Sequence, residues 1–542
     1  MMRIPCLLMA AFLLWSTPAS AAVYYFSAAD GDDTHCTGLA STPYGGGDAQ
    51  PCPFKTIAKL QTLSLGGTLV GDDQLLLKAG ETFSGTTLTT TASGTAGHQI
   101  IYGRYGVGAN PIITAGTTYF TLNCNPGAYL TFDGIDFINT RTTVGDRAVS
   151  ITAGSGFVFK NGSYNGYSYS MQQSGATAGL TLGPGLTLTS AINHALNIVG
   201  SGAASNFVAN NITVAAGGKI SVHGFSNVTI ANATWTTTSL NELVGVSTCT
   251  GIVAIADIKG AATSGIVTVS ASTFTSGAIT RVKGTLALGS GPGFSVATSS
   301  SGFSILYSEI VGGTYGTWIG SNSNNITIGH NKLHGGSHPV IYLHTVHDII
   351  VEDNEMFASA DDGFNTQNGC YSVTVRRNRS HDNGTKTNVS AGDGFSTHST
   401  DRGIDFSYNM AWRNTSSGFA LTEQSVGTMD HNIAVNNGGN WTGEGGVDTT
   451  RGGFYITVNA VNPTTGTTWT MTRCIGQGNY PVEVQVATAM KDLVAFDYNT
   501  YWPTNPLYCA SIDSLSTKIS WTTYHATYEK HSLSVNPNLV MP

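Results

Sequence analysis

The sequence predicts an all-β protein of the β-solenoid class, closed by a short helix near its N-terminal end. Of the 542 residues, 67 are Gly and only 10% are charged, while 41% are hydrophobic and the net charge is −8. Disordered chains combine low hydrophobicity with high net charge, so this composition indicates a folded, turn-rich chain. The mild acidity also argues against a nucleic-acid partner, because such proteins carry a basic patch.

Five consecutive units in the region 325–460 share one pattern. Each unit opens with an alternating apolar strand, continues to an Asn and closes on a second strand. The Asn residues are 23, 24, 31 and 23 residues apart and are Asn331, Asn354, Asn378, Asn409 and Asn432. A period in the twenties is typical of solenoids, in which stacked units bury a shared core. We therefore expect parallel stacked strands here, with the Asn side chains in one ladder at a turn.

The remaining chain is compatible with the same coil. The stretch "PFKTIAKLQTL" (53–63) places Phe54, Ile57, Leu60 and Leu63 at helical intervals and predicts a capping helix. The segment 140–300 alternates but has no regular period, so we expect loops or short strands outside the main coil there.

The N-terminus has the pattern of a secretory signal peptide. Arg3 precedes the apolar run "CLLMAAFLLW", and the segment "STPASA" after it holds Ala19 and Ala21 in A-x-A spacing, so we expect residues 1–21 to be removed and 22–542 to form a single domain. The run is too short to span a membrane. The expected product is a secreted or periplasmic monomer without a membrane span. In an oxidising compartment, Cys36 and Cys52 are the expected disulfide pair.

Two nearly identical acidic phrases mark the candidate site. "SADDGFNTQ" (359–367) and "AGDGFSTH" (391–398) lie on adjacent units, and aligning their Phe residues places Asp362 beside Asp393, with Asp361 next to them. Residues one and three positions beyond each Phe then form two outward columns, which are Tyr342, Asn365, Ser396 and Ala420, and His344, Gln367, His398 and Thr422. Eight of the 14 His also fall within 330–431. This concentration of ionisable groups predicts an active site.

Stacked carboxylates repel one another, and three explanations fit them. A hard cation such as Ca²⁺ would bind their oxygens. A proton shared between them would suit general acid catalysis. The third explanation is structural, because Asp-Gly readily forms a tight turn.

Both ends of the chain and the acidic phrases carry a family resemblance. The opening "VYYFSAADGDD", the helix "PFKTIAKLQTL" and the tail "FDYNTYW" with "NPNLV" resemble right-handed parallel β-helix proteins of the pectate-lyase-like superfamily. The acidic phrases look like the Asp-Asp-Gly-aromatic and Asp-Gly-Phe-x-x-Lys elements of calcium-dependent pectate lyases. The resemblance implies that Asp361, Asp362 and Asp393 bind calcium. In this chain His398 replaces the catalytic Lys, and the two phrases occur in reverse order.

By this resemblance we expect a polysaccharide lyase that cleaves a uronate-containing glycan by β-elimination. His398 would remove the sugar proton, Arg402 would stabilise the enolate charge, and Lys386 would lie on a loop that closes over substrate. Six side chains are expected to contact the glycan, namely His344, Tyr342, Asn365, Gln367, Arg377 and Trp412. The alternatives are a glycoside hydrolase with paired Asp residues, a C5-epimerase and a non-enzymatic adhesin.

Overall fold

The computed structural model describes most of the chain between residues 21 and 520. The segments outside the description are 1–20, 174, 176–177, 193, 217, 240, 385–390, 399, 423–425, 440–450, 458–468, 488–493, 503–509, 514–517 and 521–542. The predicted signal peptide and Lys386 therefore lie outside the described residues, apart from Ala21.

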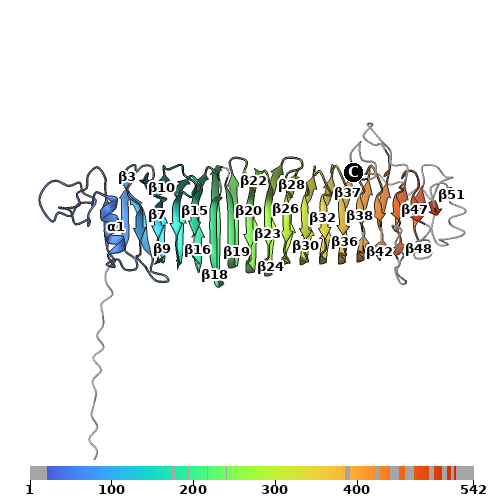
Figure 1. Ribbon diagram of the computed structural model, residues 1–542, viewed down its shortest axis with the longest axis horizontal. Coiled ribbons are helices and arrows are strands. Elements are labelled where there is room, and N and C mark those ends of the chain that lie inside the picture. The colour runs from blue at the N-terminus through green and yellow to red at the C-terminus, as the bar shows by residue number, and fades with distance from the viewer. Residues whose placement is uncertain are drawn as a thin grey trace, which may run out of the picture.

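The described chain is a β-solenoid whose rungs stack along one long axis, with the helix α1 (Ile57–Leu65) at the N-terminal end (Figure 1). On most of the described rungs the chain gives one strand to each of three parallel ladders of strands, which we name sheets X, Y and Z in the order in which the chain visits them. The predicted fold class is confirmed.

Six rungs carry the candidate site. Their X strands are β27 (Ser301–Leu306), β30 (Asn324–Gly329), β33 (His347–Glu352), β36 (Tyr371–Arg376), β39 (Arg402–Ser407) and β42 (Val426–Asp430). Their Y strands are β28 (Glu309–Val311), β31 (Lys332–His334), β34 (Glu355–Phe357), β37 (Arg379–His381), β40 (Met410–Trp412) and β43 (Ile433–Val435). Their Z strands are β29 (Thr317–Gly320), β32 (Ile341–His344), β35 (Phe364–Gln367), β38 (Phe395–Thr397), β41 (Phe419–Leu421) and β44 (Phe454–Ile456).

The register within the Z sheet fixes which side chains meet. Ile341 pairs with Phe364, Phe364 with Phe395, and Phe395 with Phe419. All four side chains are buried, and the rings of Phe395 and Phe419 stack with centroids 4.9 Å apart. Outward positions are therefore set by the core ladder, and Tyr342, Asn365 and Ser396 share one column as the sequence predicts.

The segment 140–300 corrects one expectation, because it continues the coil instead of leaving it. Two long strands, β18 (His194–Ala216) and β19 (Lys219–Trp235), pass through the corners of the coil and pair in parallel along most of their length. Asn211 and Asn232 are left-handed in β18 and β19, with φ of 52° and 53°. The corners within β18 and β19 have no buried Asn that recurs from rung to rung, so the period of the coil cannot be recognised in this part of the sequence.

The predicted Asn ladder is confirmed at the turn between the X and Y sheets. Each amide donates from Nδ2 to Oδ1 of the Asn on the next rung, at 3.0 Å, from Asn331 through to Asn432. All five side chains are buried. A buried backbone N–H needs a partner, and each Oδ1 also accepts the backbone N–H of the previous ladder Asn.

A second Asn ladder, which we did not predict, lies at the turn between the Y and Z sheets. Its amides are joined at 2.9–3.0 Å from rung to rung and belong to Asn383, Asn414, Asn437 and Asn479. Three of these residues follow a member of the first ladder by five positions, as Asn383 follows Asn378. The ladder ends on the buried carboxylate of Glu483, which accepts from the backbone N–H of Asn479 at 3.2 Å.

The second ladder explains why Gly precedes Phe on each of these rungs. A Cβ added to Gly394 would lie 2.9 Å from Nδ2 of Asn414, 2.8 Å from Cβ of Ala411 and 2.6 Å from the carbonyl oxygen of Gly418. Gly363, Gly418 and Gly453 meet their own ladder amides in the same way. Glycine is thus required by the close approach of the amide ladder, and Gly-Phe in the acidic phrases is a structural signature.

The N-terminal end is closed largely as predicted. Helix α1 begins four residues later than the predicted stretch, after the N-cap Thr56, whose hydroxyl accepts the N–H of Lys59. Ile57 and Leu60 are buried against the coil. The disulfide between Cys36 and Cys52 is confirmed.

We expect Gly394→Ala to destabilise the protein by about 1–3 kcal/mol, the cost typical of overpacking a filled core. Gly45→Ala is the matched control, because a Cβ there meets no atom within 4 Å. Chemical denaturation of both variants measures the difference. Equal stability of the two variants would contradict the proposed role of the glycine column.

Candidate active site

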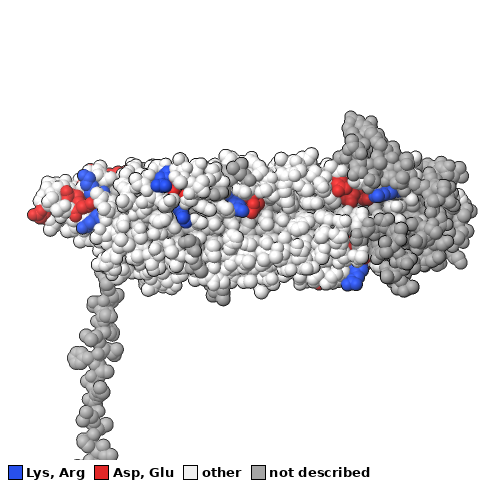
Figure 2. Space-filling view, in the orientation of Figure 1, with Lys and Arg blue, Asp and Glu red and all other residues white. Residues whose placement is uncertain are grey.

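The candidate site lies where the chain turns from the Y sheet into the Z sheet. Asp361 and Asp362 precede β35, and Asp393 occupies the position of Asp362 on the next rung, since Gly363 donates its N–H to the carbonyl of Asp393 at 2.9 Å. Figure 2 shows that charged side chains are sparse along the molecule, with acidic and basic atoms side by side toward its C-terminal part. The predicted juxtaposition of the three Asp residues is present.

Asp362 is a structural carboxylate. Its Oδ1 accepts the backbone N–H groups of Gly392 and Asp393 at 3.1 and 2.8 Å. Its Oδ2 accepts from Nδ2 of Asn365 at 3.0 Å and from the hydroxyl of Ser396 at 2.6 Å. With only 4% of its surface exposed, Asp362 ties two rungs together and is not presented to solvent as we expected.

Asp393 is buried and paired with a cation that the sequence analysis missed. Its Oδ2 lies 2.9 Å from Nη1 of Arg451, and its Oδ1 accepts the N–H of Ser417 at 2.7 Å. Arg451 also lies over the ring of Tyr455, at 5.3 Å. Arg451 stands three residues before Phe454, the offset that Asp361 has from Phe364, so aligning the Gly-Phe columns could have found it.

Asp361 is the half-buried member of the cluster, and its environment favours the protonated form. Burial, followed by the charges of Asp362 and Asp393, raises the pKa of Asp361 to about 7. Burial also raises the pKa of Asp393 to about 7, against the opposing charge of Arg451. The charge of Arg451 favours the ionised form of Asp393, whereas the charges of Asp362 and Asp393 favour the protonated form of Asp361.

Two tyrosine rings extend the site toward the N-terminus. Tyr315 and Tyr342 stack with centroids 5.2 Å apart, and the charge of Asp361 contributes to raising the pKa of Tyr315, after burial. The hydroxyl of Tyr342 donates to Oε1 of Gln367. The predicted contacts Tyr342, Asn365 and Gln367 thus share the outer face of the Z sheet with the acids, although Asn365 is buried.

The predicted base lies at the other end of the Z strands. His398 is five residues beyond Asp393, which corresponds to about 16 Å of extended chain. Its Nδ1 lies 2.9 Å from the hydroxyl of Thr422. His344 is two rungs away on the same edge, with Nε2 2.5 Å from Nδ2 of Asn368. The two histidines form a separate edge of the face, apart from the carboxyls.

The structure places the other predicted side chains elsewhere. Arg402 begins β39 on the X sheet and lies over the ring of Tyr371, at 5.5 Å. Arg377 pairs with Glu352 and Asp353 at the turn between X and Y, both at 2.8 Å. Trp412 belongs to the Y sheet, where it is buried and stacked on His381 at 4.1 Å. These three residues do not join the acidic cluster.

A buried carboxyl near His398 was also missed. Asp401 accepts the N–H groups of Gly369 and Cys370 through Oδ1, at 2.9 and 2.8 Å, and the N–H of His398 through Oδ2 at 3.3 Å. Burial raises its pKa to about 7. Besides a contact with the side chain of Thr366, its contacts are with backbone N–H groups of the turn, which indicates a structural role.

Calcium does not fit the acids as they are arranged. The ion takes six to eight oxygen ligands, but both oxygens of Asp362 are occupied by N–H and O–H donors and Asp393 faces Arg451. Among the described residues, no three His, Cys, Asp or Glu side chains are grouped to hold a metal ion. Calcium binding at Asp361, Asp362 and Asp393 stays a prediction that this geometry does not favour.

The comparisons with known proteins concern the fold. A family model described as a right handed beta helix region matches residues 258–461. Comparison with curated proteins gives no match. No helix in the described part of the chain is long and apolar enough to cross a membrane.

Several solved structures are similar to this chain at low identity. A lacto-N-biosidase from Eubacterium ramulus is 13% identical, with 72% of this chain and 64% of that chain covered and a TM-score of 0.25. An alginate lyase from Paenibacillus sp. is 13% identical, with 75% and 97% covered and a TM-score of 0.21. A mannuronic acid specific family 6 lyase from human gut microbiota is 11% identical, with 95% and 92% covered and a TM-score of 0.27. At these identities the likeness concerns the β-helix fold alone.

Replacing Asp361 by Asn tests whether folding raises the pKa of Asp361. A carboxyl whose pKa is raised by folding makes its full contribution to stability when the pH is below its pKa in the unfolded chain. It loses that contribution as the pH rises through its pKa in the folded state, which is about 7 for Asp361. Asp361→Asn, which mimics the protonated carboxyl, should therefore melt close to wild type at pH 4 and above wild type at pH 8. The exposed Asp348→Asn variant is the control. A lower melting temperature of Asp361→Asn at pH 8 would contradict this assignment.

A chelator tests the metal. Because an ion bound only by the folded state stabilises it, EDTA should leave the melting temperature unchanged if the acids hold a proton and no calcium. A lower melting temperature in EDTA, restored by added Ca²⁺ and absent in Asp393→Asn, would establish the calcium site.

Proposed function

We propose that this protein is an exported carbohydrate-active enzyme that cleaves a polysaccharide on the outer face of the Z sheet, with Asp361 as the proton-transferring group. The observation that carries the proposal is the pairing of two carboxyls of raised pKa, Asp361 and Asp393, with one guanidinium, that of Arg451. Pairs of titratable groups held in unequal environments are typical of acid–base catalysis. The disulfide between Cys36 and Cys52 supports export.

Hydrolysis is the reaction that this arrangement favours. A protonated carboxyl near neutral pH can give its proton to the glycosidic oxygen as the bond from that oxygen to the anomeric carbon breaks, while a water molecule bonds to that carbon and releases one proton to the solvent. Asp361 is half-buried and can meet a substrate, whereas Asp393, with 2% of its surface exposed, acts through its charge on Asp361. Tyr315, whose pKa the charge of Asp361 helps to raise after burial, stacks on Tyr342, and these two rings suit the apolar faces of sugar rings.

β-Elimination on a uronate glycan is the second candidate, and Arg451 is the observation that favours it. Its guanidinium lies at the acids, with 21% of its side-chain surface exposed, and could attract a sugar carboxylate. In this reaction His398 would remove the sugar proton, as the family resemblance implies. The substrate would then have to reach across the Z strands from Arg451 to His398.

One activity assay separates the two reactions. Purified protein is incubated with neutral and uronate-containing glycans, and new reducing ends are measured together with the absorbance of unsaturated uronate. Hydrolysis raises only the first signal, and elimination raises both. Asp361→Asn should lower the rate by about 10²–10⁴-fold, as expected on loss of a general acid, whereas Asp348→Asn should not change it. A fully active Asp361→Asn enzyme would exclude Asp361 from the mechanism. A loss of activity in His398→Ala alone would favour elimination.

A further inference from the structure

A polar groove lies far from the candidate active site, on the outer face of the X sheet near the N-terminal end. It is a hollow of about 610 Å³ on the strands β2 (Gln74–Lys78), β5 (Ile100–Tyr105) and β9 (Leu130–Asp133). A volume of this size is typical of small-molecule and saccharide sites, which span about 300–1,000 Å³. The acidic cluster is many rungs away along the coil (Figure 1).

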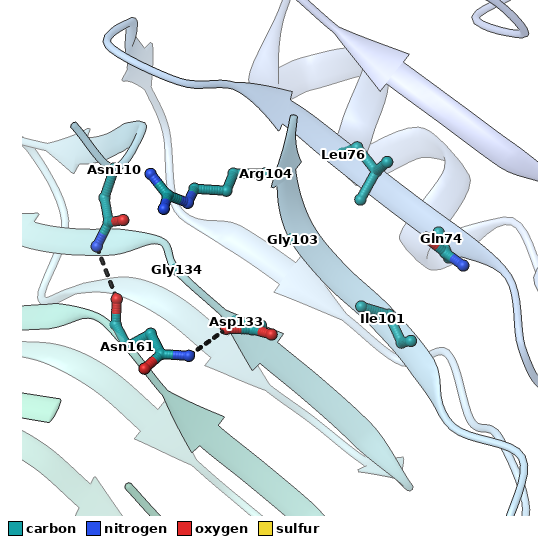
Figure 3. Close-up of a pocket in the computed structure, with 9 residues that line it drawn as sticks. All are labelled: Gln74, Leu76, Ile101, Gly103, Arg104, Asn110, Asp133, Gly134 and Asn161. Carbon is teal, nitrogen blue, oxygen red and sulfur yellow. Dashed lines mark hydrogen bonds between the residues drawn. The ribbon is translucent and has the colours of Figure 1, made fainter. Parts of the chain in front are cut away.

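The hollow exists because one outward position has no side chain. Gly103 pairs with Leu76 on the neighbouring strand, and a Cβ at Gly103 would lie 3.2 Å from Cδ2 of Leu76. Leu76 and Ile101 form an apolar floor beside it (Figure 3). A floor of this kind can receive the C–H face of a sugar ring.

The rim on the other side is polar and held in place. Asn110 donates from Nδ2 to Oδ1 of Asp136 at 2.9 Å and to the carbonyl of Asn161 at 2.7 Å. Asn161 donates from Nδ2 to Oδ1 of Asp133 at 2.8 Å (Figure 3). Because these side chains are fixed before any ligand binds, a ligand does not have to order them.

Arg104 also lines the groove, and its positive charge is not paired with a carboxylate of the described chain. Its Nη1 donates to the carbonyl of Gly108 at 2.8 Å, and no ion pair joins it to a carboxylate in the described part of the chain. The nearby Asp133 pairs instead with Lys160, at 3.1 Å. A guanidinium carries five N–H donors in a planar fork that fits a carboxylate or a sulfate. Arg104 is exposed and keeps most of these donors available.

We infer that this groove is a second glycan-binding site, which takes an acidic oligosaccharide segment and binds its carboxylate or sulfate group through Arg104. The amide side chains of Gln74, Asn110 and Asn161 would hydrogen-bond sugar hydroxyls, and Leu76 and Ile101 would contact the ring. The site lies on the open face of a sheet, which suits a polymer that continues beyond the groove at both ends. Its role would be to hold a long glycan on the solenoid, away from the rungs that carry Asp361.

Affinity electrophoresis through gels that contain dextran, dextran sulfate or polygalacturonate tests the inference. The first two probes differ only in charge, and the third presents carboxylates. The wild type should be retarded by at least one of the two anionic polymers and not by dextran. The net charge of −8 disfavours unspecific binding of a polyanion.

Three variants locate the site. Arg104→Gln should weaken binding at least about tenfold, as expected when a charge-assisted hydrogen bond is lost. Gly103→Leu should fill the groove and weaken binding without lowering the melting temperature by more than a few degrees. Lys259→Gln removes one exposed positive charge on another sheet and should bind like wild type.

The result separates this site from the proposed activity. Asp361→Asn should lose cleavage and keep its retardation, and Arg104→Gln should keep its rate on short soluble substrates. Absence of retardation of the wild type by both anionic polymers would overturn the inference. Equal retardation by dextran, or unchanged binding of Arg104→Gln, would overturn the role of Arg104.

Discussion

The buried amide ladders are the interaction on which the rest of this structure depends. At each corner of a solenoid the chain turns away from its sheets, and its backbone N–H groups lose their strand partners. An Asn side chain resolves this on successive rungs, because Oδ1 accepts from the rung before it and Nδ2 donates to the rung after it. The rungs between 325 and 460 are held in register by two such ladders, one on each side of the short Y strands.

The second ladder also determines the sequence around the site. On four rungs its amides come so close to the residue before the Z strand that only Gly fits there, and the Phe that opens the strand belongs to the core stack. Only the residue before Gly is free to vary. It is Asp at positions 362 and 393, Ser at 417 and Gly at 452. Of these, the carboxylate of Asp362 ties two rungs together, and that of Asp393 pairs with Arg451.

The fold could be predicted because a buried Asn recurs in the sequence at a nearly regular spacing. The first ladder recurs at nearly constant intervals, so the stack, the Phe core and the outward columns all followed from the sequence. The second ladder was missed although Asn383, Asn414 and Asn437 recur at the spacing of the first ladder; only its last member, Asn479, lies 42 residues beyond Asn437. The long strands β18 and β19 were missed because their corners carry exposed Asn in place of a buried repeat.

The site was only partly predictable, because residues that are close in the sequence of a solenoid can lie on different faces of it. Each rung visits three faces within one period. The histidines that cluster in sequence are spread among stacks such as Tyr307 with His330, and His381 with Trp412. The nearby arginines other than Arg402 are matched to carboxylates of the preceding rung, as Arg413 is to Asp382 at 2.7 Å. The alignment of phrases correctly placed Asp362 beside Asp393, but the burial of these side chains could not be inferred from it. Arg451 was missed although it has the same offset from Phe454 as Asp361 has from Phe364.

We propose that Asp361 holds a proton near neutral pH beside the charge of Asp393. Infrared spectroscopy of the carboxyl C=O stretch, recorded as a difference between wild type and Asp361→Asn from pH 4 to pH 9, tests it directly. The account predicts a protonated carboxyl band that is present in wild type, disappears with a midpoint near pH 7 and is missing from the variant. If this band is instead lost with a midpoint below pH 5 as the pH rises, Asp361 is an ordinary carboxylate that is ionised at neutral pH, and the proposal is wrong.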